Sequence, residues 1–200
     1  MTDSDIFDGL PSERGHFLLE SGYHTNLWLT LDRLFLAPTR VAPLVTALAE
    51  RLAGHHPTAI CGPLRGGAFL AQALATTLGL GFYFTEPGPT DPAGRLFGAT
   101  YRLPAGLSPL IRGERLAIVD DVISAGSSVR ATAATVAAAG ATVAVVGALA
   151  VMGSIALEHF DGLGVPVVSL ARHDLPMWPP ASCPLCQAGV PLRDPGQTSR

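Results

Sequence analysis

One stretch, residues 115–130, constrains the fold more than any other part of the chain. It begins with an apolar run at residues 116–119, continues with the acidic pair Asp120 and Asp121, and leads through a loop of small residues into an Ala-rich segment. A short apolar run of this kind is typical of a strand buried on both faces of a parallel sheet. The Ala-rich segment, residues 129–139, predicts a helix. The stretch therefore predicts a strand, an acidic turn, a loop and a helix in succession, as in an α/β fold.

The loop has the composition of a phosphate site. It consists of Ser124, Ala125, Gly126, Ser127 and Ser128. Small side chains let successive backbone N–H groups approach an anion, glycine tolerates positive φ, and the helix that follows adds its positive end. The two aspartates lie at the carboxyl end of the strand, where open α/β sheets bind ligands, and can accept hydrogen bonds from ribose hydroxyls. The alternative is an acidic turn with a serine N-cap, but the joint occurrence of these features favours the ligand site.

The run at residues 117–128, AIVDDVISAGSS, resembles the 5-phosphoribosyl-1-pyrophosphate (PRPP) signature of type I phosphoribosyltransferases. That family transfers ribose 5-phosphate from PRPP to a nitrogenous base, releases pyrophosphate and uses Mg²⁺. The resemblance implies that Asp120 and Asp121 are catalytic residues that hold the ribose hydroxyls, and that residues 124–128 bind the 5-phosphate. It does not specify the base.

A second glycine-rich loop, GPLRGG at residues 62–67, follows a predicted strand at residues 58–61 and precedes a predicted helix at residues 68–78. Such a loop can enclose a pyrophosphate with backbone N–H groups while an arginine balances the charge. An ordinary strand-to-helix turn is the alternative, but PRPP requires two anion sites. The family resemblance assigns pyrophosphate binding to Leu64, Arg65, Gly66 and Gly67.

Residues 86–112 form a long connection rich in proline and glycine, which in a compact domain is either a functional lid or disorder. The resemblance implies a mobile flap whose lysines contact pyrophosphate. All 13 basic residues of this chain are arginines, however. We therefore assign Arg95 to pyrophosphate binding and Arg102 to catalysis, although the planar fork of arginine differs from the compact charge of lysine.

Both ends of the chain carry a further resemblance. Apolar residues alternate around Ser21 and Gly22, which predicts a hairpin within residues 15–32, whereas residues 1–14 predict a helix. FLLESG at residues 17–22 resembles the amino-terminal hood of orotate phosphoribosyltransferases, and WPPASCPLCQAGVPL at residues 178–192 resembles the carboxyl terminus of certain bacterial members. The candidates for the base pocket are Phe17, Tyr23, Trp28 and Met152.

Cys183 and Cys186 form a CxxC motif, which is half of a zinc knuckle by its spacing. The sequence has no second pair, and His173 and Cys61 are conceivable partners without supporting spacing. A structural turn with two free thiols is the favoured interpretation; zinc shared across a dimer and a redox pair are the alternatives. We therefore assign no metal site from the sequence.

The remaining pattern completes the predicted fold. Helices are expected at residues 38–54 and 154–160, and strands at residues 81–85, 141–151 and 165–170. Their alternation predicts an α/β fold with a mainly parallel sheet flanked by helices, like the type I phosphoribosyltransferases, with a small hood from the N-terminal segment and the C-terminal tail. We expect a single domain over residues 1–200, with the hood at 1–36, the flap at 86–112 and the CxxC-containing tail at 174–200.

Composition excludes several classes of protein. Hydrophobic residues make up 48% and charged residues 14%, which does not fit a disordered chain, and the net charge of −3 argues against a nucleic-acid-binding surface. The start of the chain does not resemble a signal peptide, and the apolar runs are too short to span a bilayer. Three cysteines fit a reducing compartment, so we expect a cytoplasmic protein without a membrane partner. The family resemblance implies a homodimer.

The expected function is PRPP-dependent transfer to a base, as in orotate phosphoribosyltransferases, yielding a nucleoside 5′-monophosphate and pyrophosphate for pyrimidine biosynthesis. The sequence departs from that branch at the base side. Glu20 occupies a position that is usually basic, and Met152 and Gly153 replace an Asp-Arg pair whose arginine binds the orotate carboxylate. Two alternatives therefore stay open: a transferase for another base, and a PRPP-binding regulatory protein without catalysis.

Overall fold

The computed structural model describes residues 12–29, 34–89 and 96–195. Its centre is a six-stranded sheet with the order β5-β4-β3-β6-β7-β8, in which only the β4–β5 pair is antiparallel. The strands are β3 (Ala59–Pro63), β4 (Gly81–Pro87), β5 (Tyr101–Arg102), β6 (Arg115–Ile123), β7 (Thr142–Met152) and β8 (Val167–His173). This arrangement confirms the predicted α/β class with a mainly parallel sheet.

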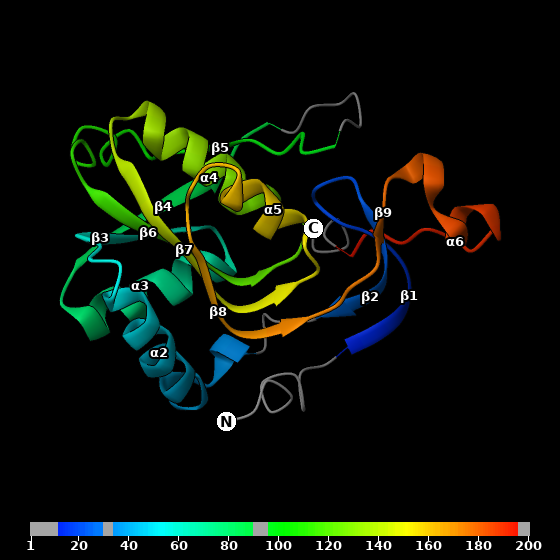
Figure 1. Cartoon of the computed structure of the whole chain (residues 1–200), viewed down its shortest axis with the longest axis horizontal. Helices are drawn as coiled ribbons and strands as arrows, with labels where there is room; N and C mark the ends of the chain where they lie inside the picture. The colour runs from blue at the N-terminus through cyan, green and yellow to red at the C-terminus, as the bar shows by residue number, and fades with distance from the viewer. Residues whose placement is uncertain (1–11, 30–33, 90–95, 196–200) are drawn as a thin grey trace.

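Helices cover both faces of the sheet (Figure 1). On one face lie α2 (Pro38–Ala53) and α3 (Gly66–Leu78), and on the other lie α4 (Ser127–Ala138) and α5 (Ile155–Asp161). The core is accordingly divided into two apolar clusters, one on each side of the sheet. Alternate residues of β6 supply both clusters, since Val119 belongs to the first and Ile118 to the second. Burial on both faces explains the continuous apolar run of the sequence.

The order of the strands places a ligand crevice between β3 and β6. From β3 the chain continues to β4 on one side, whereas β6, β7 and β8 follow one another on the other side. In open α/β sheets, ligands bind at the carboxyl ends of strands where the direction of winding reverses. Both glycine-containing loops of the sequence lie at this switch point, because one follows β3 and the other follows β6.

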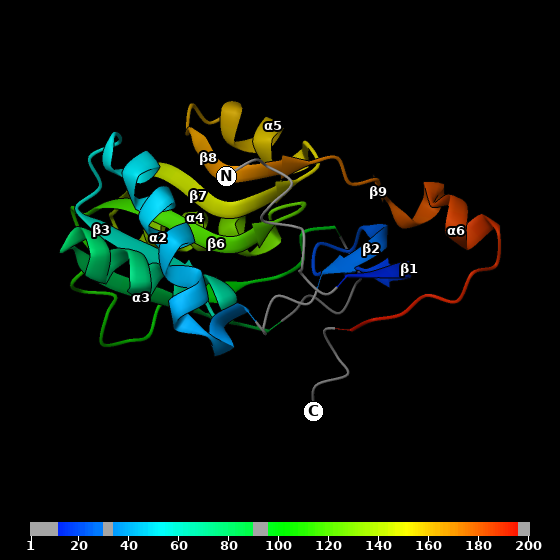
Figure 2. The ribbon, with the colours of Figure 1, turned by 90° about the horizontal axis from the view of Figure 1, so that it is seen from below.

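A second, three-stranded sheet lies beside the carboxyl ends of the main sheet (Figure 2). It consists of β1 (Ser12–Leu18), β2 (His24–Leu29) and β9 (Met177–Trp178), in the order β1-β2-β9 with antiparallel pairs. Two short helical turns, η2 (Pro180–Ser182) and α6 (Pro184–Gln187), follow β9, and η1 (Leu34–Leu36) precedes α2. We call residues 12–29 and 177–193 the hood.

The predicted hairpin is present, but the predicted helix over residues 1–14 is wrong for residues 12–14. Those residues begin β1, where Ser12 and Arg14 pair with Leu29 and Leu27. Their side chains are exposed, so the polar pattern that indicated a helix instead belongs to the solvent-facing end of a strand. Residues 1–11 lie outside the described residues.

The tail closes the hood by pairing with its first strand. The Leu18 amide donates to the carbonyl of Arg193, and the Arg193 amide donates to the carbonyl of His16, each over 2.9 Å. The Arg193 guanidinium also pairs with Glu13 and lies 5.2 Å from the centre of the Phe17 ring. Residues near both ends of the sequence therefore form one small body.

Among the residues that the structure describes, no helix combines the length and the apolar character that crossing a membrane requires.

Candidate active site

The acidic pair follows the continuous buried run at residues 116–119 of β6, and Asp120 is almost fully enclosed. Its Oδ1 accepts the backbone N–H of Asp121 over 3.0 Å, and its Oδ2 accepts the hydroxyl of Ser128 over 2.7 Å. Burial, together with the adjacent Asp121 carboxylate, raises the pKa of Asp120 well above its usual range, against the lowering effect of the Ser128 hydrogen bond. The Ser128 bond fixes the carboxylate against the first turn of α4.

The second carboxylate faces the cavity and the neighbouring loop. Asp121 is partly exposed, and its Oδ1 accepts the backbone N–H of Val122 over 2.7 Å. A Cβ on Gly66 would lie 2.1 Å from Asp121 Oδ2, and a Cβ on Gly67 would lie 2.8 Å from Asp120 Oδ1. The glycines of the loop after β3 therefore allow its backbone to lie directly against both carboxylates of β6.

The loop after β6 has the properties of an anion site. All five of its residues line one cavity, namely Ser124, Ala125, Gly126, Ser127 and Ser128. Gly126 has a φ of 83° immediately before α4, so the loop uses the left-handed conformation that the sequence predicted for this glycine. The Ser127 hydroxyl is buried without a hydrogen-bond partner in the structure. Buried hydroxyls are normally paired, and a phosphate at this helix start would supply the missing acceptor.

The loop after β3 is tightly folded. A Cβ on Gly62 would lie 2.1 Å from the carbonyl oxygen of Gly67, and the Leu64 amide donates to the carbonyl of Thr85 on β4 over 2.8 Å. Arg65 is exposed at the tip, so its cation is available to a ligand. The four residues predicted to bind pyrophosphate, 64–67, thus lie next to the acidic pair.

The cavity has a volume of about 490 Å³ and two different walls. One wall is the run from Asp121 to the start of α4, and the other comes from the hood. The lining residues from the hood, together with those at the base of the cavity, are Leu19, Glu20, Ser21, Leu27, Trp28, Leu29, Met152, Leu175 and Pro195. None of the lining residues in the described part of the chain carries a positive charge.

Two of the four predicted base-pocket residues line this cavity, and two do not. Trp28 and Met152 face it. Phe17 is fully buried behind Trp28, with ring centres 6.1 Å apart, and Tyr23 packs against Phe97 at 5.8 Å. The sequence analysis missed Leu27, Leu29 and Leu175. The first two alternate with Trp28 in the hairpin, but the sequence alone does not reveal that both faces of β2 reach the cavity.

Glu20 is held at the edge of the cavity by the flap. The hydroxyl of Tyr101 on β5 donates to Glu20 Oε1 over 2.8 Å, and the Tyr101 carbonyl accepts the hydroxyl of Thr135 on α4 over 2.7 Å. Desolvation raises the pKa of Glu20, and the Tyr101 hydrogen bond partly offsets this effect. The flap therefore connects the hood to α4.

Arg102, one of the two arginines assigned to the site from the flap, does not line the cavity. Arg102 Nη2 forms an ion pair with Glu86 over 2.8 Å at the edge of the sheet, and Arg102 is absent from the cavity lining. Arg95 lies outside the described residues. The catalytic role of Arg102 and the pyrophosphate role of Arg95 stay predictions.

The CxxC motif lies in the hood, away from the partners that the sequence suggested. Cys61 is buried in the core on β3, and His173 ends β8. Cys183 and Cys186 instead meet His16 and His24. The sequence analysis missed both histidines.

Comparison with known proteins identifies the family. Residues 37–160 match the phosphoribosyl transferase domain. The chain belongs to the phosphoribosyltransferase family. It is 30% identical to the orotate phosphoribosyltransferase of Caldanaerobacter subterraneus subsp. tengcongensis, over 96% of this chain and 94% of that protein. It is 33% identical to the orotate phosphoribosyltransferase of Pelotomaculum thermopropionicum, over 91% and 88%.

Solved structures support the same fold. The crystal structure of orotate phosphoribosyltransferase from Aeropyrum pernix superposes with a TM-score of 0.65 at 24% identity, covering 86% of this chain and 93% of that one. The protein is a PRPP-dependent phosphoribosyltransferase of the orotate phosphoribosyltransferase type, and hence a pentosyltransferase. As a phosphoribosyltransferase it belongs to a family that generally uses Mg²⁺ with PRPP.

Proposed function

We propose that this phosphoribosyltransferase transfers the 5-phosphoribosyl group of PRPP to a pyrimidine-type base, with orotate as the reference acceptor, and releases pyrophosphate. The observation that carries the proposal is the contact between the Asp120–Asp121 pair and the Gly66–Gly67 backbone. This contact joins a sugar-binding doublet, an anion loop and a second anion loop at one edge of the cavity. Residues 1–200 would act as one catalytic domain, soluble in the cytoplasm and paired as a homodimer.

The site accommodates PRPP in one orientation. The 5-phosphate would lie in the loop at residues 124–128, where the unpaired Ser127 hydroxyl is available. The ribose hydroxyls would donate to Asp120 and Asp121, and the pyrophosphate would lie against residues 64–67 with Arg65 balancing its charge. The base would then occupy the hood side of the cavity, beside Trp28 and Met152.

The residues present fit Mg²⁺. The partly exposed Asp121 carboxylate, in a cradle that a Cβ on Gly66 would fill, offers hard oxygen donors beside the diphosphate position. When bound, Mg²⁺ would neutralise charge on the departing pyrophosphate. The Asp121 carboxylate and the diphosphate oxygens would hold it.

The chain's own residues would act mainly by position and charge. Cleavage of the bond between the anomeric carbon and pyrophosphate leaves an oxocarbenium-like sugar, and a nitrogen of the base forms the new bond from the opposite face. The carboxylates of Asp120 and Asp121 would stabilise the positive sugar, while the two loops hold its phosphate and the leaving group. No covalent enzyme intermediate is required.

The test is the double substitution Asp120→Asn and Asp121→Asn. We expect kcat/KM for PRPP to fall by about 10³-fold or more, since preorganised charge supplies much of the rate. Asp161→Asn, on the exposed end of α5, is the matched control and should leave turnover unchanged. Full turnover by the double variant would refute the assignment of the sugar site.

A second acceptor class is favoured by the acidic edge of the cavity. Glu20, and no cation, faces the base side among the described lining residues, so a carboxylate-bearing base lacks a charge-assisted partner there. Such a contact contributes about 1.5–3 kcal/mol. A base without a carboxylate, which could donate hydrogen bonds to Glu20, would fit this edge better.

A panel of bases distinguishes these possibilities. The protein is incubated with PRPP, Mg²⁺ and orotate, uracil, adenine or hypoxanthine, and the nucleotide product is measured by mass spectrometry. Orotate turnover supports the first acceptor class, and turnover of a neutral base supports the second. PRPP binding without pyrophosphate release for any base contradicts both and favours a regulatory protein.

A further inference from the structure

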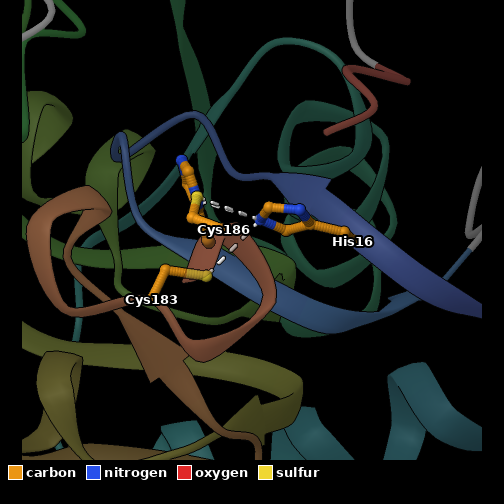
Figure 3. Close-up of side chains that lie close together, drawn as sticks. His16, Cys183 and Cys186 are labelled. Atoms are coloured by element: carbon orange, nitrogen blue, oxygen red, sulfur yellow. Dashed lines mark hydrogen bonds between the residues drawn. The ribbon is translucent and has the colours of Figure 1, made fainter. Parts of the chain in front are cut away.

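Four potential metal ligands converge inside the hood, apart from the sugar site. The Nε2 atom of His16 lies 3.4 Å from Cys183 Sγ and 3.7 Å from Cys186 Sγ (Figure 3). His24 Nδ1 lies 3.0 Å from His16 Nε2 and 3.3 Å from Cys186 Sγ. All four ligand atoms lie within 4.8 Å of one another.

Four of the six separations are close to the edges of a tetrahedral zinc site, and the other two are within 4.8 Å. With Zn–S bonds of about 2.3 Å and Zn–N bonds of about 2.0–2.1 Å, tetrahedral angles place neighbouring ligand atoms about 3.3–3.8 Å apart. Three of the four measured distances fall in this range, and the distance between the histidine nitrogens is a few tenths of an ångström shorter. A small outward movement of one imidazole would centre an ion.

The outer contacts orient His16 for coordination. Its Nδ1 lies 2.8 Å from the carbonyl oxygen of Val190, which can only accept a hydrogen bond, so Nδ1 carries the proton. The Nε2 lone pair is then directed toward the two sulfurs and His24. A backbone carbonyl behind a metal-binding histidine is a common second layer of a zinc site.

We propose that His16, His24, Cys183 and Cys186 bind a structural Zn²⁺ ion. Two thiolates and two imidazoles with no oxygen donor favour zinc over Mg²⁺ or Ca²⁺, and four protein ligands leave no open position for catalysis. Binding converts both thiols to thiolates and releases two protons to solvent. This assignment replaces the interpretation of Cys183 and Cys186 as free thiols in a turn.

The ion would connect three separate segments of the hood. His16 is on β1, His24 is on β2, Cys183 is the N-cap residue of α6, and Cys186 lies within α6. The same hairpin supplies Leu19, Trp28 and other lining residues of the cavity, so the zinc would hold the base-side wall. The inference does not depend on PRPP chemistry, because none of the four ligands lines the cavity.

Metal analysis of the full-length protein, purified under reducing conditions without chelator, is the first test. We expect about one zinc ion per chain, lost on treatment with a thiol-modifying reagent. Cys186→Ser and His24→Gln should each reduce the zinc content at least tenfold. Cys61→Ala and His55→Gln, which alter a core thiol and a loop imidazole outside the cluster, should retain the zinc.

Cobalt substitution provides a readout that does not depend on activity. Co²⁺ in this site should show the intense visible absorption of tetrahedral thiolate coordination, and Cys186→Ser should lose it. A folded wild-type protein with reduced thiols but without zinc or cobalt binding would overturn the proposal. So would a Cys183–Cys186 disulfide in the reduced preparation, or zinc retained by both ligand variants. Circular dichroism of each variant separates lost binding from lost folding.

Discussion

At the scale of single residues, the candidate site places two adjacent carboxyl groups where burial makes a negative charge costly. Asp120 is enclosed next to Asp121, and only the Ser128 hydroxyl and one backbone amide oppose the cost. An ionised Asp120 therefore lowers the stability of the protein without ligand. A cationic sugar or a metal ion at the cavity would relieve the repulsion.

This arrangement predicts an unusual pH dependence for Asp120→Asn. The pKa of Asp120 is raised in the folded protein, so the folded state binds more protons than the unfolded state above about pH 4, and wild-type stability falls as pH rises through this window. The variant lacks this loss. We expect the free energy of unfolding of Asp120→Asn, relative to wild type, to increase between pH 5 and pH 8, by at most about 1.4 kcal/mol per pH unit.

Urea unfolding at both pH values without PRPP measures this difference. Asp161→Asn is again the control, and its stability relative to wild type should not change with pH in the same direction. If the difference in free energy of unfolding between Asp120→Asn and wild type is the same at both pH values, the pKa of Asp120 is not raised in the folded protein.

At this scale the sequence alone groups the candidate residues that are neighbours in the chain. Asp120, Asp121 and the loop at residues 124–128 are contiguous, so the sequence alone is enough to group them. The sequence alone is not enough to group the four residues of the proposed zinc site, because His16 and Cys186 are 170 positions apart. The predicted hairpin could have indicated that the two histidines are close, because within it His24 pairs with Leu18, two residues from His16.

At the scale of elements, glycines determine how closely the loops approach. Gly126 adopts its positive φ where α4 begins, and a Cβ there would lie 2.9 Å from the Cβ of Ala156 on α5. Gly113 has the same φ of 83°, but a Cβ on this residue would have no neighbouring atom within 4 Å. A comparison of substitutions at Gly126 and Gly113 therefore separates the effect of backbone strain from that of steric overlap.

Gly126→Ala should therefore be more destabilising than Gly113→Ala. The left-handed backbone alone costs about 1–2 kcal/mol, and overpacking against α5 adds about 1–3 kcal/mol. Thermal or urea unfolding of both variants measures the two contributions. Equal losses would mean that α5 moves away without cost.

Gly66→Ala should impair PRPP use while leaving the fold intact. A methyl group 2.1 Å from Asp121 Oδ2 must displace the carboxylate or the loop, so we expect KM for PRPP to rise by about tenfold or more, equivalent to about 1.4 kcal/mol. Gly106→Ala, where a Cβ meets nothing within 4 Å, is the control. Unchanged PRPP kinetics in Gly66→Ala would separate this loop from the sugar site.

The sequence pattern predicted the secondary structure well where strands are buried on both faces. The runs of β6 and β7 have few polar interruptions, and helix α2, at residues 38–53, agrees with the predicted range of 38–54 to within one residue. The start of β1 was missed because Ser12, Glu13 and Arg14 are exposed and carry no apolar alternation. Their strand conformation comes from pairing with β2, which local pattern does not report.

At the scale of the whole molecule, the main sheet and the hood line one cavity between them. The run from Asp121 to Ser128, which follows the main sheet into α4, supplies one wall, and the hood supplies the opposite wall. The general arrangement was predictable from the alternation of strands and helices. The family resemblance predicted that the tail contributes to the hood, but the sequence pattern did not predict the pairing of β9 with β2, since β9 has only two residues and pairs across more than 150 positions.

Hydrogen exchange should show whether PRPP contacts both the loop after β3 and the loop after β6. PRPP with Mg²⁺ should protect the backbone amides of residues 64–67 and 124–128 together, because each loop binds one anionic end. Inorganic phosphate alone should protect mainly residues 124–128. Protection confined to one loop with PRPP would contradict the two-site arrangement, and α2 serves as an internal reference.

The pairing of Arg193 with residues 16–18 has a consequence during synthesis. A ribosome makes β1 before the strands of the main sheet, yet its second neighbour in the ladder emerges only after some 175 further residues. The nascent chain can complete the main sheet first, since β8 ends at residue 173. The hairpin must therefore wait, with one edge open, until residue 193 has been made.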